Sequence, residues 1–114
     1  MKPSFITTPI YYINARPHIG HAYTTMLADA YARSRRLLGE DVFFMTGTDE
    51  HGQKVERAAQ KSGTKTEVFA DETAEHFRQM TRDLNISNDD FIRTTEPRHF
   101  RAAQEIWRRV PGAG

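Results

Sequence analysis

The stretch Phe5-Ile6-Thr7-Thr8-Pro9-Ile10-Tyr11-Tyr12, followed at a short distance by Pro17-His18-Ile19-Gly20-His21, decides the fold of this chain. Phe5 to Thr8 is β-branched and aromatic, which predicts a buried strand that Pro9 ends. Residues 14–17 are loop, and a helical pattern begins at Ile19. The sequence therefore predicts a strand–loop–helix unit with two histidines at the mouth of the helix.

The rest of the chain continues this alternation of strands and helices. Helices are predicted over 19–38, with Gly39 as the stop, over 52–62, from a Thr66 cap, and after a Thr95 cap. Strands are predicted over 42–46 and 91–94, and residues 47–49 are predicted to turn. The order β-α-β-α-α-β-α is typical of an α/β fold with a parallel sheet and right-handed crossovers.

Apolar spacing predicts which helix faces are buried. The first helix has an apolar face made of Ala22, Tyr23, Met26, Leu27, Ala30, Tyr31 and Leu38. The last helix is expected to face inward with Phe100, Ala103, Ile106, Trp107 and Val110.

Composition excludes several classes of function. The chain has 114 residues, one domain or part of one, and a net charge of +1, so bulk charge gives no argument for nucleic-acid binding. It has no cysteine, which excludes disulfides and thiolate metal sites and is compatible with the cytosol. No signal peptide and no apolar run of about 20 residues is present, so we expect no membrane association.

The histidine segment predicts a phosphate site. A helix start offers free N–H groups and partial positive charge, and Gly20 leaves the backbone open to a phosphate. His18 and His21 share one helix face and can contact one ligand. Two alternatives remain: a histidine pair that serves the helix start without a ligand, and a metal site completed by Asp49 and His51.

Three blocks carry a resemblance to a known family. Thr8 to Asn14 followed by Pro17-His18-Ile19-Gly20-His21 is similar to the signature segment of class I aminoacyl-tRNA synthetases. Thr46-Gly47-Thr48-Asp49-Glu50-His51-Gly52-Gln53-Lys54, and Phe91 to Glu96 with His99, resemble the methionine-specific branch. H-x-G-H alone is shared with other nucleotidyl transferases, whereas the three blocks in order are more specific. The resemblance covers about residues 4–110 and implies the first half of a Rossmann-like, HUP-type nucleotide-binding fold.

The resemblance implies a role for particular residues. His18, Gly20 and His21 would bind ATP, with both histidines catalytic, because they would donate hydrogen bonds to the α-phosphate as it is attacked. Pro9, Ile10 and Tyr12 would line a methionine pocket, and Asp49 would pair with the ammonium group. Asp49 could instead be a solvated turn residue, and Tyr11, Tyr12 and Tyr23 plain core or rim aromatics. Glu50, His51 and His99 receive no role.

The resemblance also implies a function and the parts that would complete it. Family members activate methionine with ATP and Mg²⁺ and transfer it to tRNA(Met). Residues 1–110 would be the N-terminal half of the catalytic domain and 111–114 the truncated start of a connective insertion. A Lys-Met-Ser-Lys-Ser signature, the second half of the fold and an anticodon-binding domain are not in this sequence, so we expect an N-terminal fragment that is inactive alone.

The expected setting follows from the same resemblance. tRNA would be bound through the missing domains, any zinc would lie in the connective insertion rather than here, and the location would be cytoplasmic. The sequence leaves the oligomeric state open. Other functions left open are another class I synthetase, a small adenylyltransferase, and a non-catalytic fragment that binds ATP or methionine.

Overall fold

The computed structural model describes residues 3–113 and confirms the α/β alternation. The elements are β1 (Ser4–Thr7), β2 (Tyr11–Tyr12), α1 (Ile19–Leu37), β3 (Val42–Asp49), α2 (Gln53–Ser62), α3 (Thr66–Asp83), β4 (Asp90–Arg93), α4 (Pro97–Arg109) and the 3₁₀ turn η1 (Val110–Gly112). The two-residue strand β2 was not predicted. Extended backbone resumes after Pro9 and Ile10, in a stretch between the predicted strand and the predicted loop of residues 14–17.

Every strand pair in the described sheet is parallel, as predicted, and all of them involve β3. β1 pairs with the first half of β3, starting with Ser4 opposite Val42. β2 pairs with its end, where Tyr12 lies opposite Asp49. β4 lies along the other side, with Met45 opposite Asp90.

The predicted turn at residues 47–49 is wrong, because β3 continues to Asp49. Gly47 lies opposite Ile92 of β4, and a Cβ on Gly47 would be 2.0 Å from the Ile92 carbonyl oxygen. Glycine inside a strand often marks such a close approach of two backbones. Gly47 therefore lets two strands pack closely rather than ending one.

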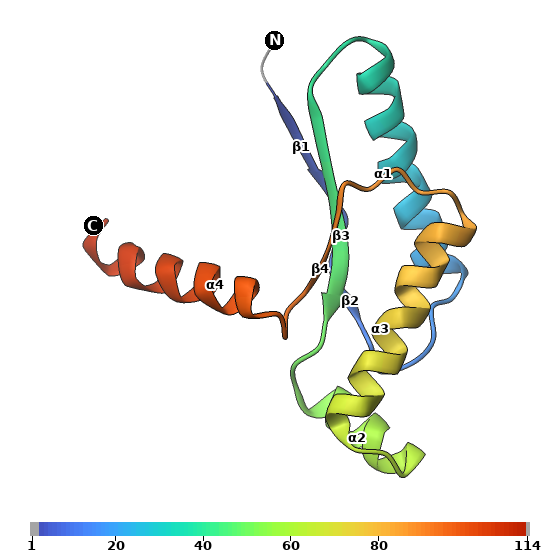
Figure 1. Ribbon diagram of the computed structural model, residues 1–114, viewed down its shortest axis with the longest axis vertical. Coiled ribbons are helices and arrows are strands. Elements are labelled where there is room, and N and C mark those ends of the chain that lie inside the picture. The colour runs from blue at the N-terminus through green and yellow to red at the C-terminus, as the bar shows by residue number, and fades with distance from the viewer. Residues whose placement is uncertain (1–2, 114) are drawn as a thin grey trace.

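Helices α1, α2 and α3 lie on one side of the sheet, and α4 leaves it on the other side (Figure 1). Between the helices and the sheet are two apolar clusters. One contains Tyr11, Ile13, Val55, Ala70, Phe77 and Phe91, and the other contains Ala32, Val42 and Phe44. Among the described residues, no helix is both long and apolar enough to cross a bilayer.

The buried face of α1 is not the predicted one. Thr25, Asp29 and Ala32 are buried, whereas Tyr23, Met26, Leu27 and Tyr31, members of the predicted apolar face, are each more than half exposed. Polar contacts account for this orientation, because Asp29 accepts hydrogen bonds from the Ser87 backbone N–H and from Arg33 Nε, both at 2.7 Å. A buried carboxylate has to keep its hydrogen-bond donors, so these contacts fix the face that α1 turns inward.

The last helix also differs from prediction. No residue of α4 is buried, and Trp107 is 78% exposed, so its apolar side chains do not face inward. In Figure 1 the helix extends away from the sheet, which leaves this face uncovered within the described residues. Thr95 does not cap α4 either. Glu96 is the N-cap residue, and the Thr95 hydroxyl donates to Glu50 at 3.0 Å.

The remaining helix ends lie close to the predicted positions. α2 ends at Gly63, which has a left-handed backbone with φ of 72°. This agrees with its predicted role as a stop, since glycine adopts that conformation without steric cost. Lys65, rather than Thr66, is the N-cap residue of α3, and it makes no side-chain capping bond.

Candidate functional site

The carboxyl ends of β2 and β3 place two of the predicted site residues next to each other. Tyr12 and Asp49 are partners in the parallel register. Tyr12 is 52% exposed, and its ring lies 5.6 Å from Lys54 Nζ, within range of a cation–π contact. The Asp49 side chain is half-buried, and among residues 3–113 it accepts no side-chain hydrogen bond. Its carboxylate is thus available to a cationic ligand.

The two histidines cap their own helix. The backbone N–H of Gly20 donates to Nδ1 of His18 at 3.0 Å, and the backbone N–H of His18 donates to Nδ1 of His21 at 3.1 Å. This reciprocal arrangement is a capping box in which imidazoles replace the usual hydroxyl and carboxylate. It brings the two ring centroids to within 3.9 Å.

These caps determine which nitrogen of each ring is a donor. In a neutral imidazole one nitrogen accepts and the other carries the proton. Because Nδ1 accepts in both rings, the hydrogen-bond network assigns the proton to Nε2 in each. Burial, and to a lesser extent the nearby His18, lower the pKa of His21, which favours its neutral form. The site therefore offers two adjacent N–H donors.

Backbone N–H groups at the start of α1 can contribute less to phosphate binding than the sequence suggested. The Gly20 N–H is occupied by His18, and the His21 N–H donates to the His18 carbonyl at 3.0 Å. Gly20 also has a second steric reason to be glycine, because a Cβ there would lie 2.8 Å from Cε1 of His18. The imidazoles, rather than free helix N–H groups, are the principal donors of this helix start.

The other predicted pocket residues, Pro9 and Ile10, are exposed in the segment between β1 and β2. The hydroxyl of neighbouring Thr8 lies 2.6 Å from that of Thr46 on β3, which ties this segment to the sheet. Pro9, Ile10 and Tyr12 thus present an exposed surface that leads to Asp49 rather than an enclosed pocket. Tyr11, by contrast, is a core residue with 8% of its surface exposed.

Glu50, which received no role from the sequence, is the most heavily bonded acid of the site. Its buried carboxylate accepts from Arg93 Nε at 2.7 Å, from Arg93 Nη2 at 2.6 Å, and from the hydroxyls of Thr48 and Thr95. Arg93 also contacts Asp71 of α3 at 2.6 Å, and these partners raise its pKa. An acid and a base that end neighbouring strands are a signal from which this pair could have been predicted.

The remaining histidines are engaged or enclosed elsewhere. His51 donates from Nε2 to the carbonyl of Thr94 at 3.2 Å, and Nδ1 of His99 is buried without a hydrogen-bond partner among the described residues. Within residues 3–113, no group of three or more ligating side chains is arranged to hold a metal ion. The alternative metal site of His18, His21, Asp49 and His51 is therefore not assembled.

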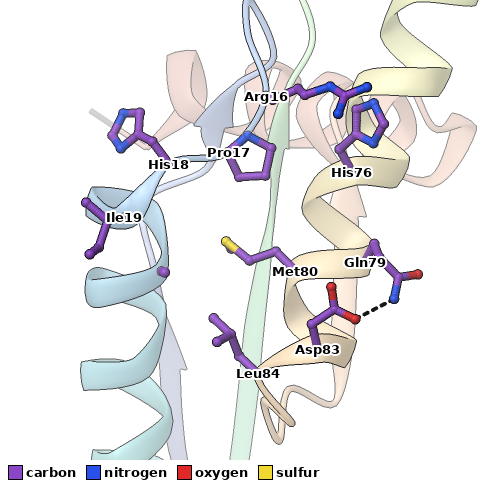
Figure 2. A pocket seen from close by; sticks show the side chains of 10 residues that line it. Arg16, Pro17, His18, Ile19, His76, Gln79, Met80, Asp83 and Leu84 are labelled. Atoms are coloured by element: carbon purple, nitrogen blue, oxygen red, sulfur yellow. Dashed lines mark hydrogen bonds between the residues drawn. The ribbon is translucent and has the colours of Figure 1, made fainter.

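A cavity of about 470 Å³ lies between the start of α1 and helix α3 (Figure 2). Met80 of α3 and Leu84, the residue that follows α3, face this cavity, and Arg16 and His76 lie at one end of it. His18 belongs to the lining, but in Figure 2 its ring points away from Met80 and Leu84. The ring of His18 thus does not point into this cavity.

Comparison with known proteins gives consistent results. The sequence model of the family "tRNA synthetases class I (M)" matches residues 4–114. A methionine–tRNA ligase from Mesorhizobium japonicum is 52% identical over 110 residues, which are 96% of this chain and 21% of that protein. One from Thermotoga maritima is 57% identical over 102 residues, 90% of this chain and 16% of that protein.

A solved structure agrees with both the fold and the sequence match. The Mycobacterium tuberculosis methionyl-tRNA synthetase in complex with methionyl-adenylate superposes with a TM-score of 0.95 at 51% identity, over 100% of this chain and 22% of that one. The chain thus spans about a fifth of the length of the proteins that it resembles.

Proposed function

The chain belongs to the class I (M) tRNA synthetase family, and we propose from that premise that it supplies ATP- and methionine-binding residues to a methionine-activating site. In the proposed reaction a carboxylate oxygen of methionine attacks the α-phosphorus of ATP. The bond to the β-phosphate bridge breaks, and methionyl-adenylate and pyrophosphate form. ATP enters with Mg²⁺ as the substrate, and the methionyl group is then transferred to tRNA.

The observation that carries this proposal is the pair of Nε2–H donors at the start of α1. Charge develops on the α-phosphate oxygens during the attack, and donors fixed beforehand stabilise it without reorganisation. Each ring of the pair is fixed by a backbone N–H at its other nitrogen, 3.0 Å away for His18 and 3.1 Å for His21. Neither histidine has to exchange a proton in this role.

The methionine side of the proposal rests on the neighbouring strand ends. Asp49 offers a carboxylate to the ammonium group, and a charge-assisted hydrogen bond of this kind is among the stronger polar contacts. Tyr12, beside Asp49 in register, together with Pro9 and Ile10, offers apolar surface to the thioether side chain. Nucleotide and amino acid would thus meet where β2, β3 and α1 converge.

The same premise extends to the setting of the chain. We propose that it works as part of a catalytic domain in the cytoplasm, and that catalysis and tRNA binding need residues beyond these. Since the chain spans about a fifth of its relatives, binding rather than turnover is the appropriate test.

The experiment is a calorimetric titration of the chain with non-hydrolysable methionyl-adenylate and leucyl-adenylate analogues. We expect the methionyl analogue to bind more tightly. His18→Ala and His21→Ala should each weaken binding roughly 10- to 100-fold, as expected for the loss of a hydrogen bond to a charged oxygen. His76→Ala, on the α3 side of the cavity, is the matched control and should leave binding unchanged.

Each part of the proposal has its own contrary result. Equal affinity for the two analogues would refute the assignment of methionine. Full binding after either substitution in the histidine pair would refute the assignment of the phosphate donors.

A further inference from the structure

The imidazole of His21 is enclosed by two aromatic rings from other elements. Its centroid lies 5.0 Å from that of Tyr11 on β2 and 5.0 Å from that of Phe77 on α3. The interplanar angles are 73° and 84°, so His21 stands nearly perpendicular to both rings. Tyr11 and Phe77 are themselves stacked, with centroids 5.7 Å apart. We propose that Tyr11 and Phe77 form an aromatic clamp, made of these two residues, that positions His21 for its phosphate contact.

The clamp also reaches the backbone of His21. The Thr25 hydroxyl donates to the His21 carbonyl at 2.7 Å and lies 2.9 Å from the Tyr11 hydroxyl. Because Thr25 uses its proton on the carbonyl, the Tyr11 hydroxyl is the donor in the second contact. Tyr11 therefore holds the ring of His21 directly and its main chain through Thr25.

The clamp links the core to the start of α1. Tyr11 and Phe77 are 8% and 0% exposed, and both belong to the cluster that joins the sheet to α3. Perpendicular aromatic contacts contribute orientation in addition to buried area. The backbone N–H of His18 bonds to Nδ1 of His21, so the ring is held at this nitrogen as well as at its two aromatic neighbours. Helix α3, which carries no predicted site residue, thereby controls the geometry of the donor pair.

The electrostatic environment agrees with an enclosed ring. Burial is the larger cause that lowers the pKa of His21, and the neighbouring His18 is the smaller one. The titratable groups nearby are His18, the N-cap residue of α1, the phenol of Tyr11 on β2, and His76 beside Phe77 on α3. Opening the clamp would hydrate His21 and move its pKa upward toward the ordinary value of 6.5.

The test follows the His21 ring by NMR in the 114-residue chain. Phe77→Leu keeps an apolar side chain but removes one wall of the clamp. Phe44→Leu is the matched control, since Phe44 is equally buried but belongs to the other cluster. We expect the pKa of His21 to rise in Phe77→Leu and to stay unchanged in Phe44→Leu. Tyr11→Phe, which retains the ring, should also keep the pKa low.

The functional meaning of the clamp rests on the proposed function, and it is tested by a binding measurement that is separate from the NMR titration. Phe77→Leu should weaken binding of the methionyl-adenylate analogue about tenfold, as expected for one misplaced hydrogen bond to a charged oxygen, and Phe44→Leu should not. If the unsubstituted chain binds no analogue while the His21 titration moves as expected, the proposed function fails and the clamp stands.

Two results would overturn the clamp itself. One is an identical His21 titration in Phe77→Leu and Phe44→Leu. The other is measured on the unsubstituted chain and does not depend on variants that fold: the absence of nuclear Overhauser contacts from His21 ring protons to both Phe77 and Tyr11.

Discussion

Replacing Arg93 by alanine should lower the free energy of unfolding far more than replacing Arg98, although each arginine contacts two carboxylates. Arg93 bridges Glu50 and Asp71, and its side chain is 18% exposed while that of Glu50 is 0% exposed. Arg98 bridges Asp90 and Glu96 with a side chain that is 45% exposed. The two arginines thus allow a buried ion pair to be compared with an exposed one in the same part of the chain.

The expected magnitudes follow from burial. Removing one partner of a buried pair leaves an uncompensated charge and commonly costs about 3–5 kcal/mol. Exposed pairs contribute at most about 1 kcal/mol. A chain of this length has roughly 6–17 kcal/mol of total stability at ordinary values per residue, so Arg93→Ala would remove a large share of it. Glu50→Gln should cost less than Arg93→Ala, because it leaves no charged Glu50 buried and Arg93 keeps Asp71.

The assay is urea unfolding followed by circular dichroism, with the free energies extrapolated linearly to water. We expect the unfolding midpoint of Arg93→Ala to fall several times further than that of Arg98→Ala. Equal losses in the two variants would refute the argument from burial. A greater loss in Glu50→Gln than in Arg93→Ala would refute the argument from uncompensated charge.

Three further outcomes are expected. Burial raises the pKa of Asp29, but hydrogen bonds from Ser87 and Arg33 outweigh burial and leave the pKa below 3.8. The stabilisation from Asp29 is therefore present above pH 3.8 and is lost as the pH falls below it. Urea midpoints measured from pH 6 to pH 3 should accordingly fall less steeply in Asp29→Asn than in the unsubstituted chain. Gly47→Ala, whose Cβ would meet the Ile92 carbonyl, should lose about 1–3 kcal/mol or more of stability in thermal unfolding. Gly112→Ala, whose Cβ would have no atom of the described chain within 4 Å, should stay within about 0.5 kcal/mol. His18→Ala should lose about 0.5–2 kcal/mol of stability from helix capping, and His18→Asn should keep most of that stability. Both variants should bind the methionyl-adenylate analogue weakly. Full binding by His18→Asn would show that His18 acts only as a cap.

Local chemistry was the most predictable part of this chain. The strand of Phe5, the helix start at Ile19 and the stop at Gly63 each follow from residue types within a few positions of one another. The predicted burial of that first strand is wrong, because no residue of β1 is buried and Phe5 is 64% exposed. The histidine pair was predicted to lie on one helix face, and the structure places the rings together. That each ring caps the helix through Nδ1 could not be predicted, because it depends on the rotamers that both side chains adopt.

Long-range contacts account for what the sequence missed. The orientation of α1 depends on the hydrogen bond between Asp29 and Ser87, a residue 58 positions away. The hydrophobic pattern of the helix does not indicate that partner. The role of Phe77 depends in the same way on the packing of α3 against the start of α1. Apolar spacing in α4 predicted burial, but spacing shows only that a face is apolar and does not identify what covers it.

The central position of β3 has a consequence for how the chain is made. Ser4 of β1 pairs with Val42 of β3, so the first strand is synthesised almost 40 residues before its only partner in the described sheet. At about 5–20 residues per second, that interval is roughly 2–8 s on the ribosome. During it, β1 and β2 have no strand edge to pair with, and α1 lacks its contacts with β3. Completion of this eight-residue strand then allows both β1 and β2 to pair, and β4 joins its other side once residues 90–93 have been made. A translational pause just before β3 would lengthen this vulnerable interval, whereas a pause after it would not.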